Sequence, residues 1–235
     1  MIKGFEIVDL THLLNEKIPT WTGECGFQKR LVMDYPENIA RVMSYSCIAN
    51  AGTHIDSPSH FISGGKCIHE LTLDKELCVP IHCIDVSAKA KRDYLISCED
   101  LEHYEKTHGK MQSGSVLLGC TGWDKYWNDS VRYRSADKDG NIRCPGFSAE
   151  VGAMILERKL VGLGIDTFSP DGGNMSFPLH FQLLGAGKYL IENLTNLDKI
   201  PPVGAYLQVL PLKIEDAAES PVRAIALVST PPISN

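Results

Sequence analysis

The chain has 235 residues, of which 43% are hydrophobic, and this length suits one large domain better than two small ones. Its formal net charge is −6 at pH 7, so it lacks the excess of basic residues that attracts nucleic acid or anionic lipid. We therefore expect a single domain over 1–235, with neither nucleic acid nor a membrane as a partner.

The first ten residues predict a strand interrupted by charge, without the apolar stretch of a signal peptide or membrane span. Eight cysteines are scattered along the chain, and none forms a Cys-x-x-Cys pair. This pattern favours small buried thiols in a reducing compartment over a disulfide framework or a structural zinc site. We therefore expect a cytoplasmic enzyme.

Apolar runs and helical spacing alternate after residue 78. Residues 79–86 predict a strand, and a helix follows from Ser97, where Asp100 forms a near-capping box. A strand at 115–120 precedes the polar segment 128–143, which predicts a long surface loop with a turn at residues 139–140.

A second helix is expected from Ser148, followed by a strand at 160–165. Pro178 suits the first turn of a short helix that ends by residue 185 or 187. Further strands are expected at 188–191, 205–210 and 222–228. The alternation predicts an α/β class, namely a single-domain mixed sheet with flanking helices.

The segment 50–60 concentrates groups that bind metals or transfer protons. Four of them share the same parity, so an extended chain directs them to one side: Asn50, His54, Asp56 and His60. Gly52 and Pro58 argue against a helix, and we expect the end of a strand that runs into an irregular loop. Imidazole and carboxylate are the usual ligands of catalytic zinc and also suit manganese. The alternative is a hydrogen-bonded loop pair of His54 and Asp56, with His60 at the surface.

This segment resembles the His-x-Gly-Thr-His-x-Asp-x-Pro-x-His signature of the cyclase-like metal-dependent hydrolases, a family that includes bacterial kynurenine formamidases and isatin hydrolases. Every position of the signature matches except the first, where this chain has Asn50. Further matching segments extend along most of the chain: 9–11, 19–23, 64–66, 121–123, 164–167, 180, 183–185 and 192–194. The resemblance implies the swivelling β/β/α fold of this family.

The resemblance also implies roles for individual residues. By it, His54 and Asp56 bind the metal, His60 is the general acid and base, and a later pair completes a second metal position in some members. His180 and Glu192 match that pair, and one or two divalent ions are implied, zinc or manganese. Independently of the family, Glu192 ends an apolar strand, where a buried carboxylate needs a partner such as a metal.

Three further expectations follow from the resemblance. Trp21 matches an aromatic residue that packs against the substrate, and the chain is expected to form a homodimer or homotetramer. Asn50 departs from the signature, and because an amide oxygen is a weaker ligand than imidazole, this position binds metal poorly, acts through water or does not bind.

Three functions remain open at this point. The first is hydrolysis of a small amide, formamide, lactam or cyclic imide, with a metal-activated water and His60 as the proton carrier. The second is a non-hydrolytic cyclase or dehydratase of the same fold. The third is a metal-binding protein that has lost catalysis, which would explain Asn50.

Overall fold

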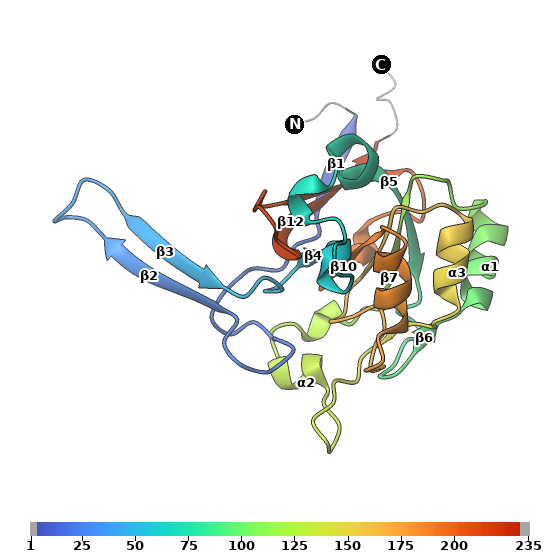
Figure 1. Ribbon diagram of the computed structural model, residues 1–235, viewed down its shortest axis with the longest axis horizontal. Helices are drawn as coiled ribbons and strands as arrows, with labels where there is room; N and C mark the ends of the chain where they lie inside the picture. Colours follow the sequence, from blue (N-terminus) through green and yellow to red (C-terminus); the bar gives the residue numbers. More distant parts are fainter. Residues whose placement is uncertain (1–3, 231–235) are drawn as a thin grey trace.

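The computed structural model of the protein describes residues 4–230, and a mixed sheet of eight strands forms its centre (Figure 1). In spatial order the strands are β1 (Phe5–Asp9), β12 (Glu219–Ser229), β11 (Ala205–Pro211), β5 (Cys78–Asp85), β7 (Val116–Cys120), β9 (Gly162–Ile165), β10 (Tyr189–Glu192) and β4 (His54–Asp56). The neighbours β5, β7, β9 and β10 run parallel, and the remaining pairs are antiparallel. The long strand β12 also pairs with β4, so the sheet closes on itself.

The helices are short and few. Helices α1 (Cys98–His108) and α3 (Val151–Glu157) lie side by side and cover one face of the sheet (Figure 1). The remaining helical elements are α2 (Ser130–Arg134), η1 (Pro58–His60), η2 (Ile68–Glu70), η3 (Leu73–Leu77), η4 (Asp124–Tyr126), η5 (His180–Leu184) and η6 (Leu197–Lys199). Among residues 4–230, no helix is long and apolar enough to cross a membrane.

Two apolar layers pack on the two faces of the sheet. In β7, Leu117 packs in the layer beneath α1 and α3, whereas its neighbours Val116 and Leu118 belong to the opposite layer. This alternation is the period of two that a strand imposes on its side chains. The strands that the sequence predicts as buried on both faces are therefore confirmed in β7, β9 and β10.

The expected elements agree with the structure except at some boundaries. Helix α1 begins after Ser97 with the complete capping box: the Ser97 hydroxyl accepts from Asp100 N, and the Asp100 carboxylate accepts from Ser97 N. The helix expected from Ser148 begins only at Val151 as α3. The sequence also suggested buried cysteines, which is wrong for the exposed thiols Cys25, Cys47 and Cys78.

The segment 128–143 differs from the expected surface loop. It contains the short helix α2, in which the ring of Tyr133 is fully buried. The Tyr133 hydroxyl donates to Asn193 Oδ1 over 2.8 Å, and the guanidinium of Arg134 donates to the Trp21 carbonyl over 3.0 Å. Tyr133 and the buried Ile142 therefore anchor an otherwise polar segment: both remove apolar area from water, and the Tyr133 hydroxyl finds an acceptor.

A two-stranded arm, formed by β2 (Phe27–Met33) and β3 (Val42–Cys47), projects from the body (Figure 1). The sequence analysis did not predict these strands, because their residues do not alternate between apolar and polar. Two short strands, β6 (Leu95–Ile96) and β8 (Gly146–Phe147), form a separate parallel pair.

Candidate metal centre

Strand register brings the first four groups of the site together. On β4, His54 and Asp56 are two residues apart and therefore point to the same face. Across the antiparallel pairs, Glu192 of β10 lies opposite His54, and Glu219 of β12 lies opposite Asp56. Because directly paired residues share a face of the sheet, all four side chains emerge on one side.

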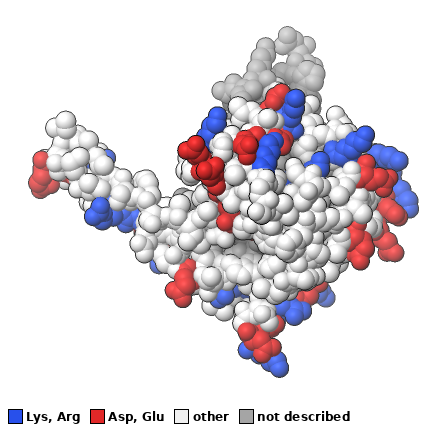
Figure 2. All heavy atoms as spheres, viewed as in Figure 1, with Lys and Arg blue, Asp and Glu red and all other residues white. Residues whose placement is uncertain are grey.

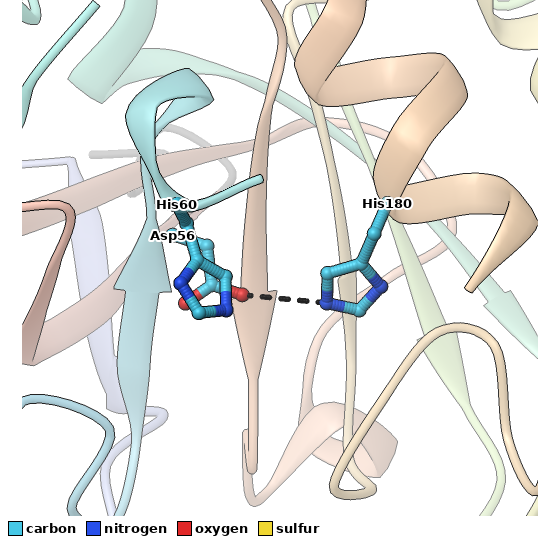
Figure 3. A group of neighbouring side chains, drawn as sticks. All are labelled: Asp56, His60 and His180. Atoms are coloured by element: carbon cyan, nitrogen blue, oxygen red, sulfur yellow. Dashed lines mark ion pairs between the residues drawn. The ribbon is translucent and has the colours of Figure 1, made fainter. Parts of the chain in front are cut away.

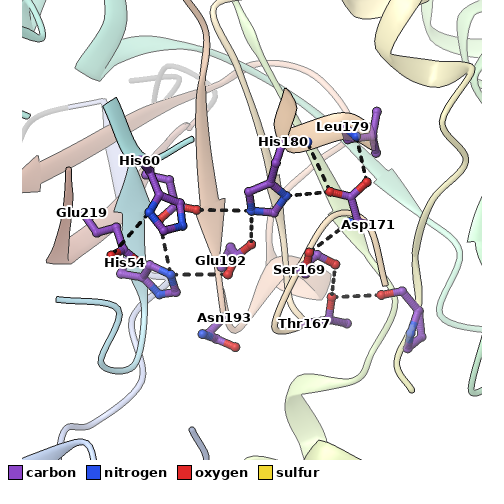
Figure 4. Close-up of polar contacts among 12 residues, drawn as sticks. His54, His60, Thr167, Ser169, Asp171, Leu179, His180, Glu192, Asn193 and Glu219 are labelled. Atoms are coloured by element: carbon purple, nitrogen blue, oxygen red, sulfur yellow. Dashed lines mark hydrogen bonds and ion pairs between the residues drawn. The ribbon is translucent and has the colours of Figure 1, made fainter. Parts of the chain in front are cut away.

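His60 reaches the site through a turn. The sequence predicts an irregular loop after Asp56, but residues 58–60 form the 3-10 turn η1, with Pro58 as its first residue. Proline favours this position because its fixed φ suits a helical turn and its missing N–H is not needed there. The turn reverses the chain, and the His60 ring then lies 3.5 Å from Glu219, measured from Nδ1 to Oε2 (Figure 4).

His180 enters from the opposite side, at the start of η5, and Asp171 holds its ring (Figure 4). Its Nδ1 lies 2.6 Å from Asp171 Oδ2, while the other Asp171 oxygen accepts from Leu179 N over 2.8 Å. Nε2 of His180 is thereby directed at the carboxylates of Asp56 and Glu192, at 3.7 and 3.4 Å. Figure 3 shows His180 facing Asp56 and His60 across the site.

His54 is held in the same manner by the backbone. Its Nδ1 lies 2.9 Å from the Gly52 carbonyl oxygen, so Nδ1 carries the proton and Nε2 faces Asp56 and Glu192, at 3.5 and 3.3 Å. Histidine ligands of metals usually have this arrangement: one ring nitrogen donates a hydrogen bond, and this bond orients the other ring nitrogen toward the metal.

These residues fit a divalent cation. Asp56 Oδ1 and Glu192 Oε1 are buried oxygens without a hydrogen-bond partner, although burying a carboxylate is unfavourable unless its charge is compensated. His54, Asp56, His180 and Glu192 are all at most 6% exposed. The donor set of imidazole nitrogen and carboxylate oxygen is the one that catalytic zinc and manganese use.

The electrostatics of the site also favour positive charge. Burial lowers the pKa of His180, but Asp171, Asp56 and Glu192 outweigh it and raise this pKa to about 12. For His54, burial likewise lowers the pKa, yet Asp56 and Glu192 raise it to about 9. The carboxylates therefore hold protons on both rings at neutral pH, and a divalent cation would displace these protons.

Two overlapping groups of ligand atoms share Asp56. One consists of Asp56, His60 and His180, and the other of His54, Asp56 and Glu219, and within each group the ligand atoms lie within 4.8 Å of one another. The expected groups His54, Asp56, His60, His180 and Glu192 thus meet at one place. Ligation by any of them, and proton transfer by His60, remain predictions.

Asn50 and Trp21 lie at the rim of the same place. Both line a cavity of about 210 Å³ above the buried carboxylates. In the described part of the chain, the Asn50 side chain forms no hydrogen bond with another residue, and it belongs to the turn that precedes β4. Trp21 contacts two phenylalanines: its ring centroid lies 6.2 Å from Phe168 and 5.9 Å from Phe177.

Sequence reasoning missed two residues of this site. Asp171 accepts hydrogen bonds from Leu179 N and His180 N, but nothing in the local sequence indicates its contact with the His180 ring. Glu219 was not singled out, because a glutamate after a polar stretch gives no local signal. Only the pairing of β12 with β4 places it at the site.

The chain is similar to proteins of one known family. The family model described as "Putative cyclase" matches residues 8–172. Isatin hydrolase of Roseibium aggregatum is 34% identical over 189 residues, covering 76% of this chain and 72% of that protein. Kynurenine formamidase of Bacillus cereus is 27% identical over 234 residues, covering 95% of this chain and 98% of that protein.

Solved structures with the same fold include isatin hydrolases. Isatin hydrolase A from Ralstonia solanacearum superposes with a TM-score of 0.90 at 29% identity, covering 96% of this chain and 92% of that one. An isatin hydrolase bound to the product analogue thioisatinate gives a TM-score of 0.87 at 28% identity, covering 97% of this chain and 94% of that one. The mixed-sheet, single-domain architecture expected from the sequence is thereby confirmed.

Proposed function

Because the chain belongs to the cyclase family, we propose that it is a metal-dependent hydrolase of a small carbon–nitrogen substrate: an amide, formamide, lactam or cyclic imide. The observation that carries this proposal is the convergence of two oriented imidazoles, His54 and His180, on two buried carboxylates, Asp56 and Glu192. The cavity beside these groups has a volume of about 210 Å³, which suits a small-molecule substrate, the expected partner.

His54, Asp56, His180 and Glu192 would hold the cation, with zinc preferred and manganese as the alternative. When bound, the cation supplies Lewis-acid chemistry, which polarises a carbonyl and makes water more acidic.

His60 supplies the proton transfer in this proposal. Its side chain is 27% exposed, unlike the buried His54 and His180, so it can exchange protons with substrate and solvent. It accepts a proton from the attacking water and returns it to the nitrogen that leaves when the carbon–nitrogen bond breaks. Because Nδ1 of His60 contacts Glu219, the other ring nitrogen, Nε2, is the one that remains free to exchange a proton with the substrate.

The cavity favours an aromatic substrate. A chain of rings lines it, in which Phe61 contacts Phe177 with centroids 5.5 Å apart, and Trp21 contacts Phe177 and Phe168. Among the described residues, none that lines the cavity is Lys or Arg. Aromatic rings bind one another through apolar burial and edge-to-face contacts, so a planar aromatic amide suits this wall.

Truncating Trp21 is expected to weaken substrate binding. Trp21→Ala should raise KM for an aromatic amide about tenfold, because losing most of a buried aromatic contact costs about 1.4 kcal/mol or more. Steady-state kinetics on the metal-loaded protein check this, and Trp21→Phe, which keeps a ring, should retain most of the binding. An unchanged KM in a folded Trp21→Ala protein would exclude Trp21 from the substrate site.

Metal analysis and isotope labelling together test the proposed function. Protein purified without chelator is analysed for zinc and manganese, then assayed on aromatic formamides, lactams and cyclic imides in heavy-oxygen water. Hydrolysis places one heavy oxygen in the product carboxylate, whereas a cyclase or dehydratase product would lack it. Absence of turnover on the whole panel would favour the metal-binding protein without catalysis.

The relatives favour hydrolysis over the two alternatives. The names isatin hydrolase and kynurenine formamidase both denote cleavage of a carbon–nitrogen bond by water, and among the described residues the expected groups converge: His54, Asp56, His60, His180 and Glu192. A decayed site would be expected to lose such an arrangement of buried charges, because without function it only destabilises the fold.

We propose that the arm formed by β2 and β3 joins two copies of the chain, in keeping with the expected homodimer or homotetramer. An isolated two-stranded hairpin is marginally stable in water, and this one exposes apolar side chains: Leu31, Val32, Met33, Tyr35, Ile39, Val42 and Tyr45. Figure 2 shows that much of its surface is neither acidic nor basic. The arm carries few charged residues, both acidic and basic, so in a two-fold contact the acidic residues of one arm can pair with the basic residues of the other.

A charged residue on the arm is expected to dissociate this assembly. Leu31→Asp should convert a dimer into monomers, or a tetramer into dimers, in sedimentation equilibrium, because it buries a charge at the contact. Leu212, which is 63% exposed on the body, provides the matched control Leu212→Asp. A monomeric wild-type protein would contradict the proposal.

We also place the protein in the cytoplasm. All eight cysteines are free thiols, including three that are exposed, and exposed thiols persist best in a reducing compartment.

A further inference from the structure

Glu219 is a carboxylate that lines the site but is not one of the four expected metal ligands. It begins β12 and lies directly opposite Asp56 in the β12–β4 pair, while Pro221 lies opposite His54. The geometry points to a further metal ligand: we propose that Glu219 completes, with His54 and Asp56, a cation position beside His60. This inference rests on the proposed function, because it requires a divalent cation at the site.

The surroundings of Glu219 leave its charge uncompensated by other means. Its side chain is only 16% exposed, and its one ion-pair contact among residues 4–230 is the 3.5 Å approach of Oε2 to His60 Nδ1. In the same part of the chain, no Lys, Arg or backbone N–H donates a hydrogen bond to its carboxylate, and the cavity has no Lys or Arg in its lining. A mostly buried carboxylate without a strong partner is costly.

Three carboxylates line this cavity: Asp56, Glu192 and Glu219. Once a cation displaces the ring protons of His54 and His180, these carboxylates place three negative charges in one partly closed space, where repulsion is stronger than in water. A single divalent cation held only by the four expected ligands offsets two of these charges and leaves Glu219 with no contact to positive charge except His60.

The distances allow ligation. The ligand atoms of His54, Asp56 and Glu219 lie within 4.8 Å of one another. Three ligands of one zinc-sized ion, each at roughly 2.0–2.2 Å from it, lie about 3.3–3.8 Å from one another. His54 Nε2 and Asp56 Oδ1 already have this spacing, at 3.5 Å. Glu219 therefore has to approach by at most about 1.5 Å, which its side chain supplies by rotation about its χ angles.

The ligand chemistry of this position differs from that of the four expected ligands taken together. Two carboxylates and one imidazole form a harder, more oxygen-rich set than two carboxylates and two imidazoles. Such a set favours manganese relative to zinc. Glu219 also connects the cation to His60, because its Oε2 faces the imidazole.

Metal titration of Glu219→Gln tests the inference. The variant keeps the size of the side chain but replaces a carboxylate oxygen with a weak amide ligand, so the affinity for Mn²⁺ should fall at least about 100-fold, the upper end of what losing an outer-shell partner costs. Isothermal titration and metal analysis after dialysis measure this without any substrate. Glu219→Asp, which retains the carboxylate, should keep part of the affinity.

Two further variants separate ligation from other roles. Glu215→Gln alters an exposed glutamate four residues away and should bind Mn²⁺ as the wild type does. His60→Ala removes the other contact of Glu219, and it should bind Mn²⁺ more tightly than Glu219→Gln. Thermal unfolding of each metal-free protein checks that the fold persists.

The outcomes are distinct. Wild-type affinity in Glu219→Gln would overturn the inference and leave the proposed hydrolase intact, with the cation held by the four expected ligands. Equal losses in Glu219→Gln and His60→Ala would also overturn it, since Glu219 would then act only through His60. A wild-type protein that binds no divalent cation would overturn the proposed function itself.

Discussion

Replacing Asp56 with asparagine is expected to remove most of the bound metal and nearly all activity, with a rate loss on the order of a thousandfold or more. Asp56 is the carboxylate shared by both groups of ligand atoms, and it is 1% exposed. The amide keeps the volume of the side chain but lacks the charge, and it offers one weak oxygen ligand in place of a carboxylate. Metal analysis and steady-state rates on the purified variant check this.

The fold is expected to persist in Asp56→Asn. The backbone pairs of β4 with β10 and β12 are unchanged by the substitution, and Asp56 accepts no hydrogen bond at Oδ1. Far-ultraviolet circular dichroism of the metal-free proteins should therefore match. His54→Ala should lose metal and activity in the same way, and if either variant retained full metal content and turnover, the site assigned here would be wrong.

Replacing His60 with alanine is expected to preserve bound metal and to reduce kcat by roughly a hundredfold or more, the usual size of acid and base assistance. His60 is the most exposed imidazole of the site, and its Nδ1 faces Glu219 rather than a buried carboxylate of the central group. Its removal therefore eliminates the proton carrier while His54, Asp56, His180 and Glu192 stay in place.

The position of His60 within 4.8 Å of Asp56 and His180 makes the metal content of this variant decisive. Metal retained with a slow rate identifies a proton carrier. Loss of metal comparable to that in His54→Ala would instead identify His60 as a ligand. Addition of imidazole to His60→Ala gives a second measurement, because a small base in the vacated space should restore part of the rate only if proton transfer was lost.

Much of this site follows from the sequence, because its signals are local. The two-residue spacing of His54 and Asp56 fixes them on one face of any strand, whatever lies next to it. Pro178 marks the short helix that carries His180, and the apolar run that ends at Glu192 predicts a buried strand with a carboxylate at its end. These features depend on backbone preferences and side-chain period over a few residues.

The tertiary structure alone decided which distant residues join them. Glu219 lies beside Asp56 because β12 is long enough to pair with β11 and then with β4, and Asp171 reaches the His180 ring because the turn after β9 folds back. Neither residue has a local signal, since side-chain parity identifies a face within one strand but not the neighbouring strand. The arm was not predicted from the sequence either. Neither face of β2 or β3 is buried against the body, so their residues do not alternate between apolar and polar.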